Sequence, residues 1–245
     1  MKTGITVFFT LFAVAMAANL PEYFKTCRRS DPQYSKCLDT TVTTIIKMLA
    51  TGLKSFKIPP IEPLAVSSVK IGESNSPVAL KQEYHNIKLH GLTNLEVKDY
   101  RIDWDKLILR STSFNPQVDF VADYSVDGQV LFLPITGKGR SNITMYNLES
   151  TNTIYCETYE KDKETYMRVK DYQIQFKPER VNLHFENLFN GDNLLGEQMN
   201  RFINENSDLL FKELQSSYEK TFGIVFAQIA NNIFSRVPMR RLFPQ

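Results

Sequence analysis

Hydrophobic residues follow two different periods along this chain, and the changes between them divide it into three parts. From Leu38 to Leu53 they recur every three or four residues, which indicates an amphipathic helix that Gly52 and then Pro59 and Pro60 bring to an end. From about residue 66 to residue 189, short runs rich in Val, Ile, Tyr, Phe and Thr alternate apolar with polar positions, which indicates β-strands. Because no helical segment separates these runs, the predicted sheet is antiparallel.

The clearest pair of strands lies in the middle of the chain. Every second position from Val118 to Val126 is apolar, and a second apolar run extends from Val130 to Leu133. Asp-Gly between two such runs predicts a tight hairpin, here at Asp127 and Gly128. Two further strands are predicted. The first has Met167 and Val169 on one face and continues through Tyr172, Ile174 and Phe176, and in the second Val181, Leu183 and Phe185 alternate with polar residues.

The third part is a long helical stripe. From about residue 193 to residue 237 there is no proline, and apolar residues keep helical spacing for about 45 residues, or roughly 65 Å of helix. Its second half is apolar on more than one side, so other elements must cover it, and the sheet is the element available. The predicted fold is therefore α+β: a long C-terminal helix wrapped by a highly curved antiparallel sheet, with a shorter N-terminal helix closing one end.

The N-terminus has the features of a secretory signal peptide. Lys2 precedes an apolar run over Ile5–Val14, and Ala15 and Ala17 place small residues where signal peptidase cleaves. The alternative is a membrane anchor, but the run is about half of the roughly 20 residues that a bilayer-spanning helix needs. We therefore expect residues 1–17 to be removed, residues 18–245 to form a single domain, and the protein to be extracellular without stable insertion in a membrane.

The chain has three cysteines and one N-glycosylation sequon. Cys27 and Cys37 enclose nine residues, and in an oxidising compartment such a close pair predicts a disulfide bond. Cys156 is either a buried thiol that acts as a small apolar residue or a group available for pairing with another chain. Asn142, followed by Thr144, is a predicted glycosylation site, the alternative being an unmodified strand residue.

The charge balance and the absence of complete motifs do not favour nucleic-acid binding, metal binding or catalysis. The 29 Lys and Arg residues nearly balance the 27 Asp and Glu residues, so no nucleic-acid partner is expected. His85, His90 and His184 lack the spacing of metal ligands and are expected to be polar surface residues of strands. The segment Gly72–Ser76 lacks the last glycine of a nucleophile elbow. We therefore predict no metal, no cofactor and no catalytic activity.

Several segments resemble the takeout and haemolymph juvenile-hormone-binding protein family of insects. They are the paired cysteines with Asp31 between them, Ile58–Leu64, Gly91–Asn94, Gly128–Gly139, Phe185–Gly196, Met199–Asn206, Ile233–Pro238 and Leu242–Pro244. Members of this family fold as a long helix wrapped by a curved antiparallel sheet, with an elongated apolar tunnel that holds lipophilic ligands. The resemblance therefore implies the fold predicted above and adds the tunnel.

The resemblance is closer to the takeout branch, although the chain departs from its pattern at two positions. Ser207 and Ser216 stand where many takeout-like chains have a tryptophan and a proline. The chain also departs from the moth-type hormone carriers, which have a second disulfide bond, because Cys156 alone cannot form one.

A cavity between helix and sheet would be lined by inward-facing side chains. The candidates are Phe120, Ala122, Tyr124, Phe132, Phe176 and Leu183 on the strands, and Phe202, Leu209 and Val225 on the helix. Tyr124 could donate its hydroxyl to a ligand carbonyl or epoxide. For each candidate the alternative is closed core packing, because a slip of one residue turns a strand side chain to the other face.

These observations favour a secreted monomeric carrier that transports a small hydrophobic ligand, such as a juvenile-hormone-like terpenoid, a fatty acid or another lipid, in haemolymph. The alternative is a secreted signalling or interaction protein that acts through its surface and has a fully packed core. An enzyme ranks third.

Overall fold

The computed structural model describes residues 20–21, 24–72, 78–131 and 133–245. The predicted signal peptide and Phe132 lie outside the described residues. Among the residues that are described, no helix is both long enough and apolar enough to cross a membrane.

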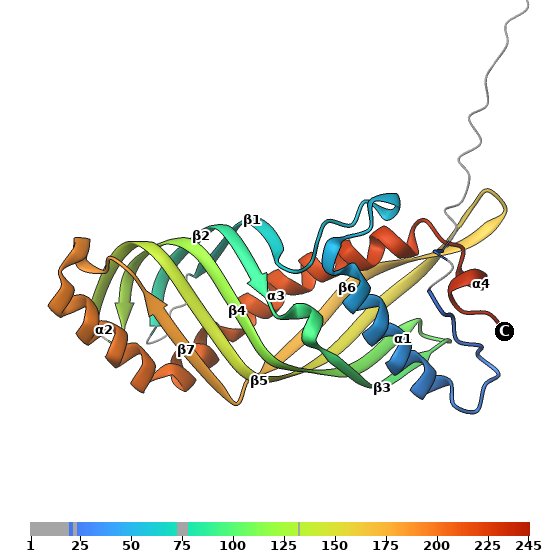
Figure 1. The fold of residues 1–245 in the computed structure, drawn as a ribbon, viewed down its shortest axis with the longest axis horizontal. Coiled ribbons are helices and arrows are strands. Elements are labelled where there is room, and N and C mark those ends of the chain that lie inside the picture. Colours follow the sequence, from blue (N-terminus) through green and yellow to red (C-terminus); the bar gives the residue numbers. More distant parts are fainter. Residues whose placement is uncertain (1–19, 22–23, 73–77, 132) are drawn as a thin grey trace, which may run out of the picture.

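One antiparallel sheet contains all the named strands. They are β1 (Leu64–Gly72), β2 (Val78–His90), β3 (Glu96–Asp103), β4 (Ile108–Val130), β5 (Leu133–Lys161), β6 (Glu164–Lys177) and β7 (Arg180–Phe185). β4 and β5 have 23 and 29 residues and pair along their whole length. β3 and β2 pair with the two halves of β4, and β7 and β6 pair with the two halves of β5. Twist accumulates along such long strands, so the sheet is strongly curved (Figure 1).

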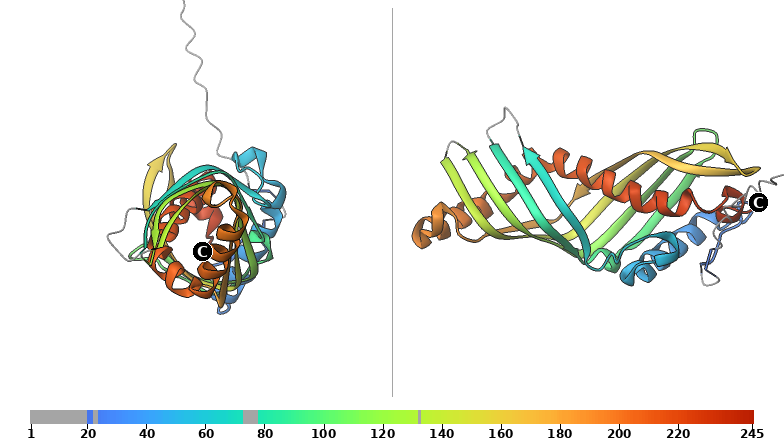
Figure 2. Two further views of the ribbon diagram at one scale, coloured as in Figure 1. Left: turned by 90° about the vertical axis from the view of Figure 1, so that its left-hand side faces the viewer. Right: turned by 90° about the horizontal axis from the view of Figure 1, so that it is seen from above.

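The helices are α1 (Tyr34–Met48), α2 (Asn193–Glu205), α3 (Ser207–Phe234) and the short α4 (Met239–Leu242). Seen end-on, the sheet curves around α3, which runs along the length of the molecule (Figure 2). α3 packs mainly on β6 and also contacts β1 and β7. α1 packs on β3. The predicted α+β fold, with a curved antiparallel sheet around a long C-terminal helix, is confirmed.

The predicted single C-terminal helix is in fact two helices. Asn206 separates α2 from α3 and has non-helical dihedrals, φ −116° and ψ 19°. The break lets α2 turn and pack on β7 at one end of the sheet (Figure 1). α3 itself is not covered all round, since every fourth residue from position 212 to position 228 is exposed to solvent.

The predicted hairpin lies a few residues from its actual position. β4 continues through Asp127 and Gly128, which pair with β5, and the last pair of the β4–β5 ladder is Val130 with Leu133. Leu131 adopts the left-handed conformation of the turn, with φ 47°. A Cβ atom on Gly128 would lie 2.1 Å from the carbonyl oxygen of Ala79, so this glycine allows β2 to approach β4 closely.

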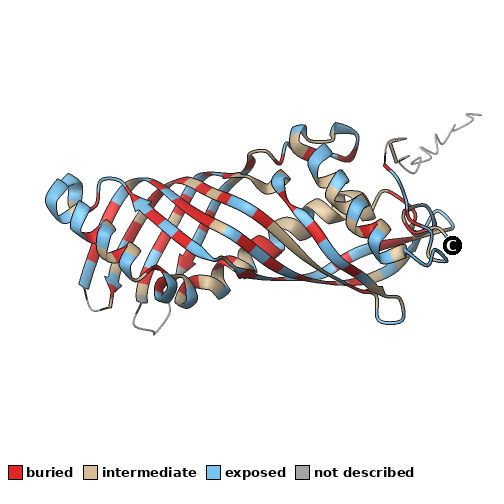
Figure 3. Cartoon of the chain, turned by 60° about the horizontal axis from the view of Figure 1, so that its bottom comes forward, coloured by how far each residue is buried: buried red, intermediate tan, exposed pale blue. Residues whose placement is uncertain are grey.

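Burial alternates along the strands as the sequence predicts (Figure 3). The predicted inward-facing residues of β4 and β7 are all buried, namely Val118, Phe120, Ala122, Tyr124 and Val126, and Val181, Leu183 and Phe185. His85 and His184 are exposed and His90 is half-buried, as expected for polar strand residues.

Helix side chains hydrogen-bond the backbone along β6 and β7. The side chain of Asn204 accepts a hydrogen bond from the Leu183 N–H at 2.9 Å and donates one to the Leu183 carbonyl at 2.7 Å. The same two-bond arrangement joins Asn200 to Phe185 and Asn231 to Val169. These bonds satisfy strand groups that pairing leaves open, and they fix the positions of α2 and α3 against the sheet.

The N-terminal segment is held by a disulfide bond between Cys27 and Cys37, with 5.9 Å between the two Cα atoms. α1 begins at Tyr34, inside the disulfide loop, and so starts earlier than the periodicity indicates. Cys156 is buried, and burial raises the pKa of its thiol to about 12. It therefore behaves as the small apolar residue of the first alternative.

Candidate functional site

A cavity of about 330 Å³, here called the main cavity, lies between α1, α3 and the concave face of the sheet. α1 contributes Leu38, Val42, Ile45 and Ile46, α3 contributes Phe222, Phe226, Ile229 and Ile233, and the sheet contributes Phe120, Met145, Leu148, Ile174 and Phe176. Aliphatic and aromatic side chains from three elements thus form most of the wall. The volume lies at the lower end of the range for small-molecule sites, which is about 300–1,000 Å³.

A second cavity of about 40 Å³ lies beside α2 and the first turns of α3. Met145 is in the wall of both cavities. Next to it, the ring of Phe120 contacts Tyr218 and Phe222 edge to face, with centroids 6.3 and 6.2 Å apart. The apolar interior is therefore divided at Met145 into two neighbouring cavities, where the resemblance implies one elongated tunnel.

A buried amide borders the second cavity. Gln82 is 5% exposed, and its side-chain oxygen accepts hydrogen bonds from the hydroxyls of Tyr84 and Tyr218. Its Nε2 atom has no hydrogen-bond partner in the described part of the chain. Burial raises the pKa of Tyr218 to about 12 and also raises the pKa of Tyr84, so both phenols stay protonated at neutral pH.

The predicted wall residues on the sheet divide between the cavities and the packed core. Phe120 and Phe176 line the main cavity, and Leu183 lines the second cavity. Ala122 is 1% exposed but lines neither, so it belongs to the core packing. The structure does not describe Phe132.

The predicted role of Tyr124 in ligand binding is not supported. Its hydroxyl donates a hydrogen bond to the backbone carbonyl of Glu186 at 2.7 Å, and its ring packs edge to face on Phe185. Burial raises the pKa of this phenol to about 12. The hydroxyl is thus engaged within the protein, and Tyr124 lines neither cavity.

The three predicted helix residues also lie outside the cavity walls. Phe202 and Val225 are half-buried and pack against the core. Leu209 is 42% exposed, which corrects its predicted inward orientation. The buried positions keep helical spacing across Asn206, through Ile203, Ser207 and Leu210, and Leu209 lies beside this stripe on the exposed side.

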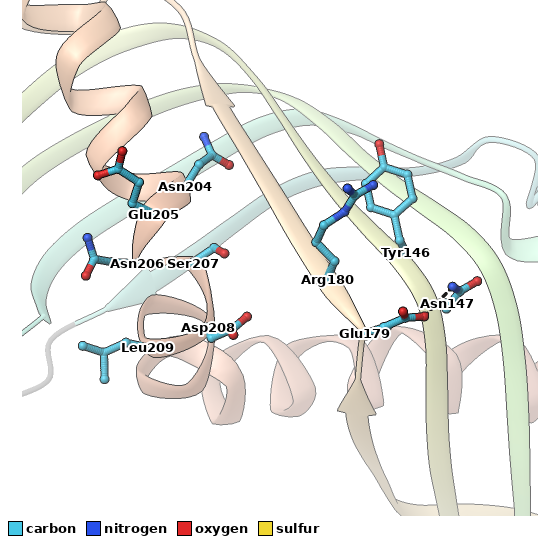
Figure 4. Close-up of a pocket in the computed structure, with 10 residues that line it drawn as sticks. All are labelled: Tyr146, Asn147, Glu179, Arg180, Asn204, Glu205, Asn206, Ser207, Asp208 and Leu209. Carbon is cyan, nitrogen blue, oxygen red and sulfur yellow. Dashed lines mark hydrogen bonds between the residues drawn. The ribbon is translucent and has the colours of Figure 1, made fainter.

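Leu209 instead borders an open cleft of about 800 Å³ where the junction of α2 and α3 faces β5 and β7 (Figure 4). The guanidinium of Arg180 lies 4.3 Å from the centroid of the Tyr146 ring, and Asn147 donates a hydrogen bond to Glu179. Charged and amide side chains form most of this wall, so the cleft suits water or a polar partner better than an apolar ligand.

The sequence pattern did not predict the polar residues in the wall of the main cavity. Small polar side chains of β4 and β5 form part of its wall, namely Ser111, Ser113, Asn115, Ser150 and Asn152. Lys25, which is exposed, is the single Lys, Arg, Asp, Glu or His among the described residues of the wall. In the described part of the chain, no group of three or more His, Cys, Asp or Glu side chains is placed to hold a metal ion.

Comparison with known proteins identifies the family. Residues 6–244 match the family described as haemolymph juvenile hormone binding protein (JHBP). The chain belongs to this family. The JHBP-family match thus spans almost the whole sequence, including the elements that enclose both cavities.

Relatives of this JHBP-family chain are distant in sequence but similar in length. It is 24% identical over 238 residues to the circadian clock-controlled protein daywake of Drosophila melanogaster, covering 94% of this chain and 90% of that protein. Daywake of Drosophila yakuba is 24% identical over 231 residues, covering 91% and 88%. The crystal structure of Takeout 1 from Epiphyas postvittana matches with a TM-score of 0.76 at 19% identity, covering 90% of this chain and 99% of that one. That match shows a shared fold.

Proposed function

We propose that this protein is a secreted, non-enzymatic carrier that binds a small hydrophobic molecule in the main cavity. The observation that carries the proposal is a 330 Å³ cavity whose wall is mostly aliphatic and aromatic and is built from α1, α3 and the sheet. Membership of the JHBP family supports it. The ligand classes that we propose are a juvenile-hormone-like terpenoid, a fatty acid or another lipid, bound by a monomer.

The energetics allow useful affinity without specific contacts. Burying about 400 Å² of apolar ligand surface contributes on the order of 10 kcal/mol at 25 cal/mol per Å². Association costs at least about 4 kcal/mol of this, which leaves micromolar binding within reach. Shape and polar groups must therefore decide which ligand is preferred.

Secretion is supported by two features. The first 17 residues have the pattern of a signal peptide, and the Cys27–Cys37 disulfide bond is typical of proteins that fold in an oxidising compartment. Asn142 is exposed on β5, and we propose that a secreted chain carries a glycan there.

The test is ligand binding by the mature chain and by two matched variants. Ile229→Trp fills the main cavity, whereas Ile224→Trp makes the same change on the same helix at a side chain that is 56% exposed. We expect displacement of a fluorescent fatty acid by lipids in the wild type and in Ile224→Trp, and at least tenfold weaker binding in Ile229→Trp. Equal ligand affinity in all three proteins would refute the carrier function. So would a wild-type protein that binds no lipid in this assay and shows no co-purified lipid in native mass spectrometry.

The second candidate function is an interaction through the surface, without a bound ligand. The open cleft with Arg180, Glu179 and Asp208 favours it, because charged clefts suit polar partners. This candidate predicts that Arg180→Ala abolishes the biological activity of the protein and that Ile229→Trp preserves it. The carrier predicts the opposite result for both variants.

A further inference from the structure

The wall of the main cavity contains a polar band in otherwise apolar surroundings. Ser111 pairs with Asn152, and Ser113 pairs with Ser150, across the β4–β5 ladder, and all four residues line the cavity. Ser150 is 3% exposed and Asn152 is 6% exposed. Buried hydroxyl and amide groups are costly unless they find hydrogen-bond partners, so their arrangement bears on what the cavity holds.

The oxygen and the nitrogen of the Asn152 amide both have hydrogen-bond partners within the protein. Its oxygen accepts a hydrogen bond from the Tyr172 hydroxyl at 3.0 Å. Its nitrogen donates to the Ser113 hydroxyl oxygen at 3.3 Å and to the Ser150 carbonyl at 3.4 Å. Asn152 therefore orients the band, and the Ser113 oxygen acts as an acceptor that leaves its own proton free.

The serine hydroxyls are the groups that remain available. Within the described residues, Ser111 and Ser150 make no side-chain hydrogen bond, and Ser113 makes only the one that it accepts from Asn152. A serine hydroxyl has one proton to donate. Three unused donors thus lie along one side of the cavity, and an oxygen atom that only accepts hydrogen bonds is the complementary group.

The scarcity of charged side chains in the wall indicates that the ligand oxygen is uncharged. No acidic or basic side chain other than the exposed Lys25 lines the described part of the wall. Moving an ionised carboxylate from water into such an environment is strongly unfavourable when no cation accompanies it. A carbonyl oxygen without charge carries no such penalty and accepts two hydrogen bonds.

We propose that Ser113 and Ser150, held by Asn152, recognise an uncharged carbonyl oxygen of the bound molecule, so that the carrier selects ketones, esters or quinones over carboxylates of the same chain length. This inference rests on the proposed function, because it needs a ligand in the main cavity. It makes the two serines determinants of specificity, while the aliphatic and aromatic wall supplies the general affinity.

The test compares three ligands that have nearly the same apolar chain, namely 2-tridecanone, dodecanoate and tridecane. A cavity of 330 Å³ holds roughly 11 groups of the size of water, at about 30 Å³ each, so chains of this length match it approximately. Each ligand displaces a fluorescent probe from the full mature chain at pH 8, where dodecanoate is ionised. A hydrogen bond of ordinary strength corresponds to about fivefold in affinity, so we expect tridecanone to bind about 5- to 25-fold more tightly than tridecane.

The double variant Ser113→Ala/Ser150→Ala is then expected to lower the affinity for tridecanone about 5- to 25-fold and to leave tridecane unchanged. Ser141→Ala is the matched control, because Ser141 is a buried serine of β5 whose hydroxyl donates to the Ala122 carbonyl and lines neither cavity. We expect this control to bind all three ligands like the wild type.

Two results would overturn the inference while leaving the carrier intact. One is an equal loss of tridecanone and tridecane affinity in the double variant, which would mean that the serines only shape the wall. The other is tightest binding of dodecanoate, abolished by Lys25→Ala, which would place the ligand head group at the exposed lysine. Failure of all three ligands to bind the wild type would instead refute the proposed function itself.

Discussion

Replacing Gly223 with alanine would separate α3 from β6. Gly223 is buried in α3, and a Cβ atom at this position would lie 2.2 Å from the backbone carbonyl oxygen of Tyr172. Ordinary contacts of a Cβ atom begin at 3.4 Å, so one element must move by about 1 Å. The oxygen belongs to the backbone of a paired strand, so a change of side-chain rotamer cannot relieve the contact.

Two opposing effects determine how much Gly223→Ala changes the free energy of unfolding. Alanine is favoured over glycine in a helix interior by about 1 kcal/mol. Overpacking typically costs about 1–3 kcal/mol, and a rigid backbone neighbour favours the upper end of this range. We therefore expect Gly223→Ala to lower the free energy of unfolding by about 1–2 kcal/mol. It should also weaken ligand binding, because Phe222 and Phe226 on either side line the main cavity.

Urea unfolding of Gly223→Ala and Gly196→Ala, side by side, is the assay. Gly196 lies in α2, and a Cβ atom there would meet its nearest neighbour, in Leu188, at an ordinary 3.8 Å. Helix propensity alone then acts, so Gly196→Ala should stabilise the protein by up to about 1 kcal/mol. If both variants are stabilised equally, the close approach of α3 to β6 is refuted, and with it the geometry of the main cavity.

Three further predictions concern single side chains. Met145→Ala should join the two cavities and lower the free energy of unfolding by about 2–5 kcal/mol. The joined cavity should accept longer ligands, so the longest alkyl chain that displaces the fluorescent probe should increase, and an unchanged maximum chain length would contradict this. Asn204→Ala removes both hydrogen bonds to the Leu183 backbone and should lower the free energy of unfolding, measured in urea, by about 2 kcal/mol or more. The Leu183 amide hydrogen should then exchange faster, and an unchanged exchange rate would count against this pairing. Because burial raises the pKa of Cys156 to about 12, its thiol stays protonated at pH 8 and should react with an aromatic disulfide reagent only after unfolding, so rapid labelling of the native protein would disprove its burial.

Alternation and helical spacing were enough to predict which faces of many elements are buried. The inward residues from Val118 to Val126 and from Val181 to Phe185 are buried as predicted, because a strand with one covered face places every second side chain in the core. The close pair Cys27 and Cys37 indicated the disulfide bond from its spacing and the expected compartment alone. These features are local, so the chain specifies them wherever the rest of the molecule lies.

The composition of the cavity wall could not be predicted, because it depends on a change of phase in the sheet. Ser111 and Ser113 face the main cavity, and so do Val118 and Phe120, so the alternation along β4 shifts by one residue between them. Counting back from Phe120 places both serines on the outer face. Pro116 lies between the two phases and is the local signal of an irregularity, because proline within a strand is confined to edges, first residues and bulges. It does not indicate the new phase, and polar residues in a strand are ordinarily interpreted as exposed.

Periodicity and the family-like segments were sufficient to predict the types of the elements, most of their buried faces and the family to which the chain belongs. The break in the C-terminal helix, the turn from β4 to β5 and the side chains that enclose the cavities became evident in the folded chain alone. The physical reason is that these features depend on contacts between residues far apart in the chain, such as Gly128 against Ala79 and Gly223 against Tyr172. A periodic pattern records that a side chain is buried, but it does not record which side chain it meets.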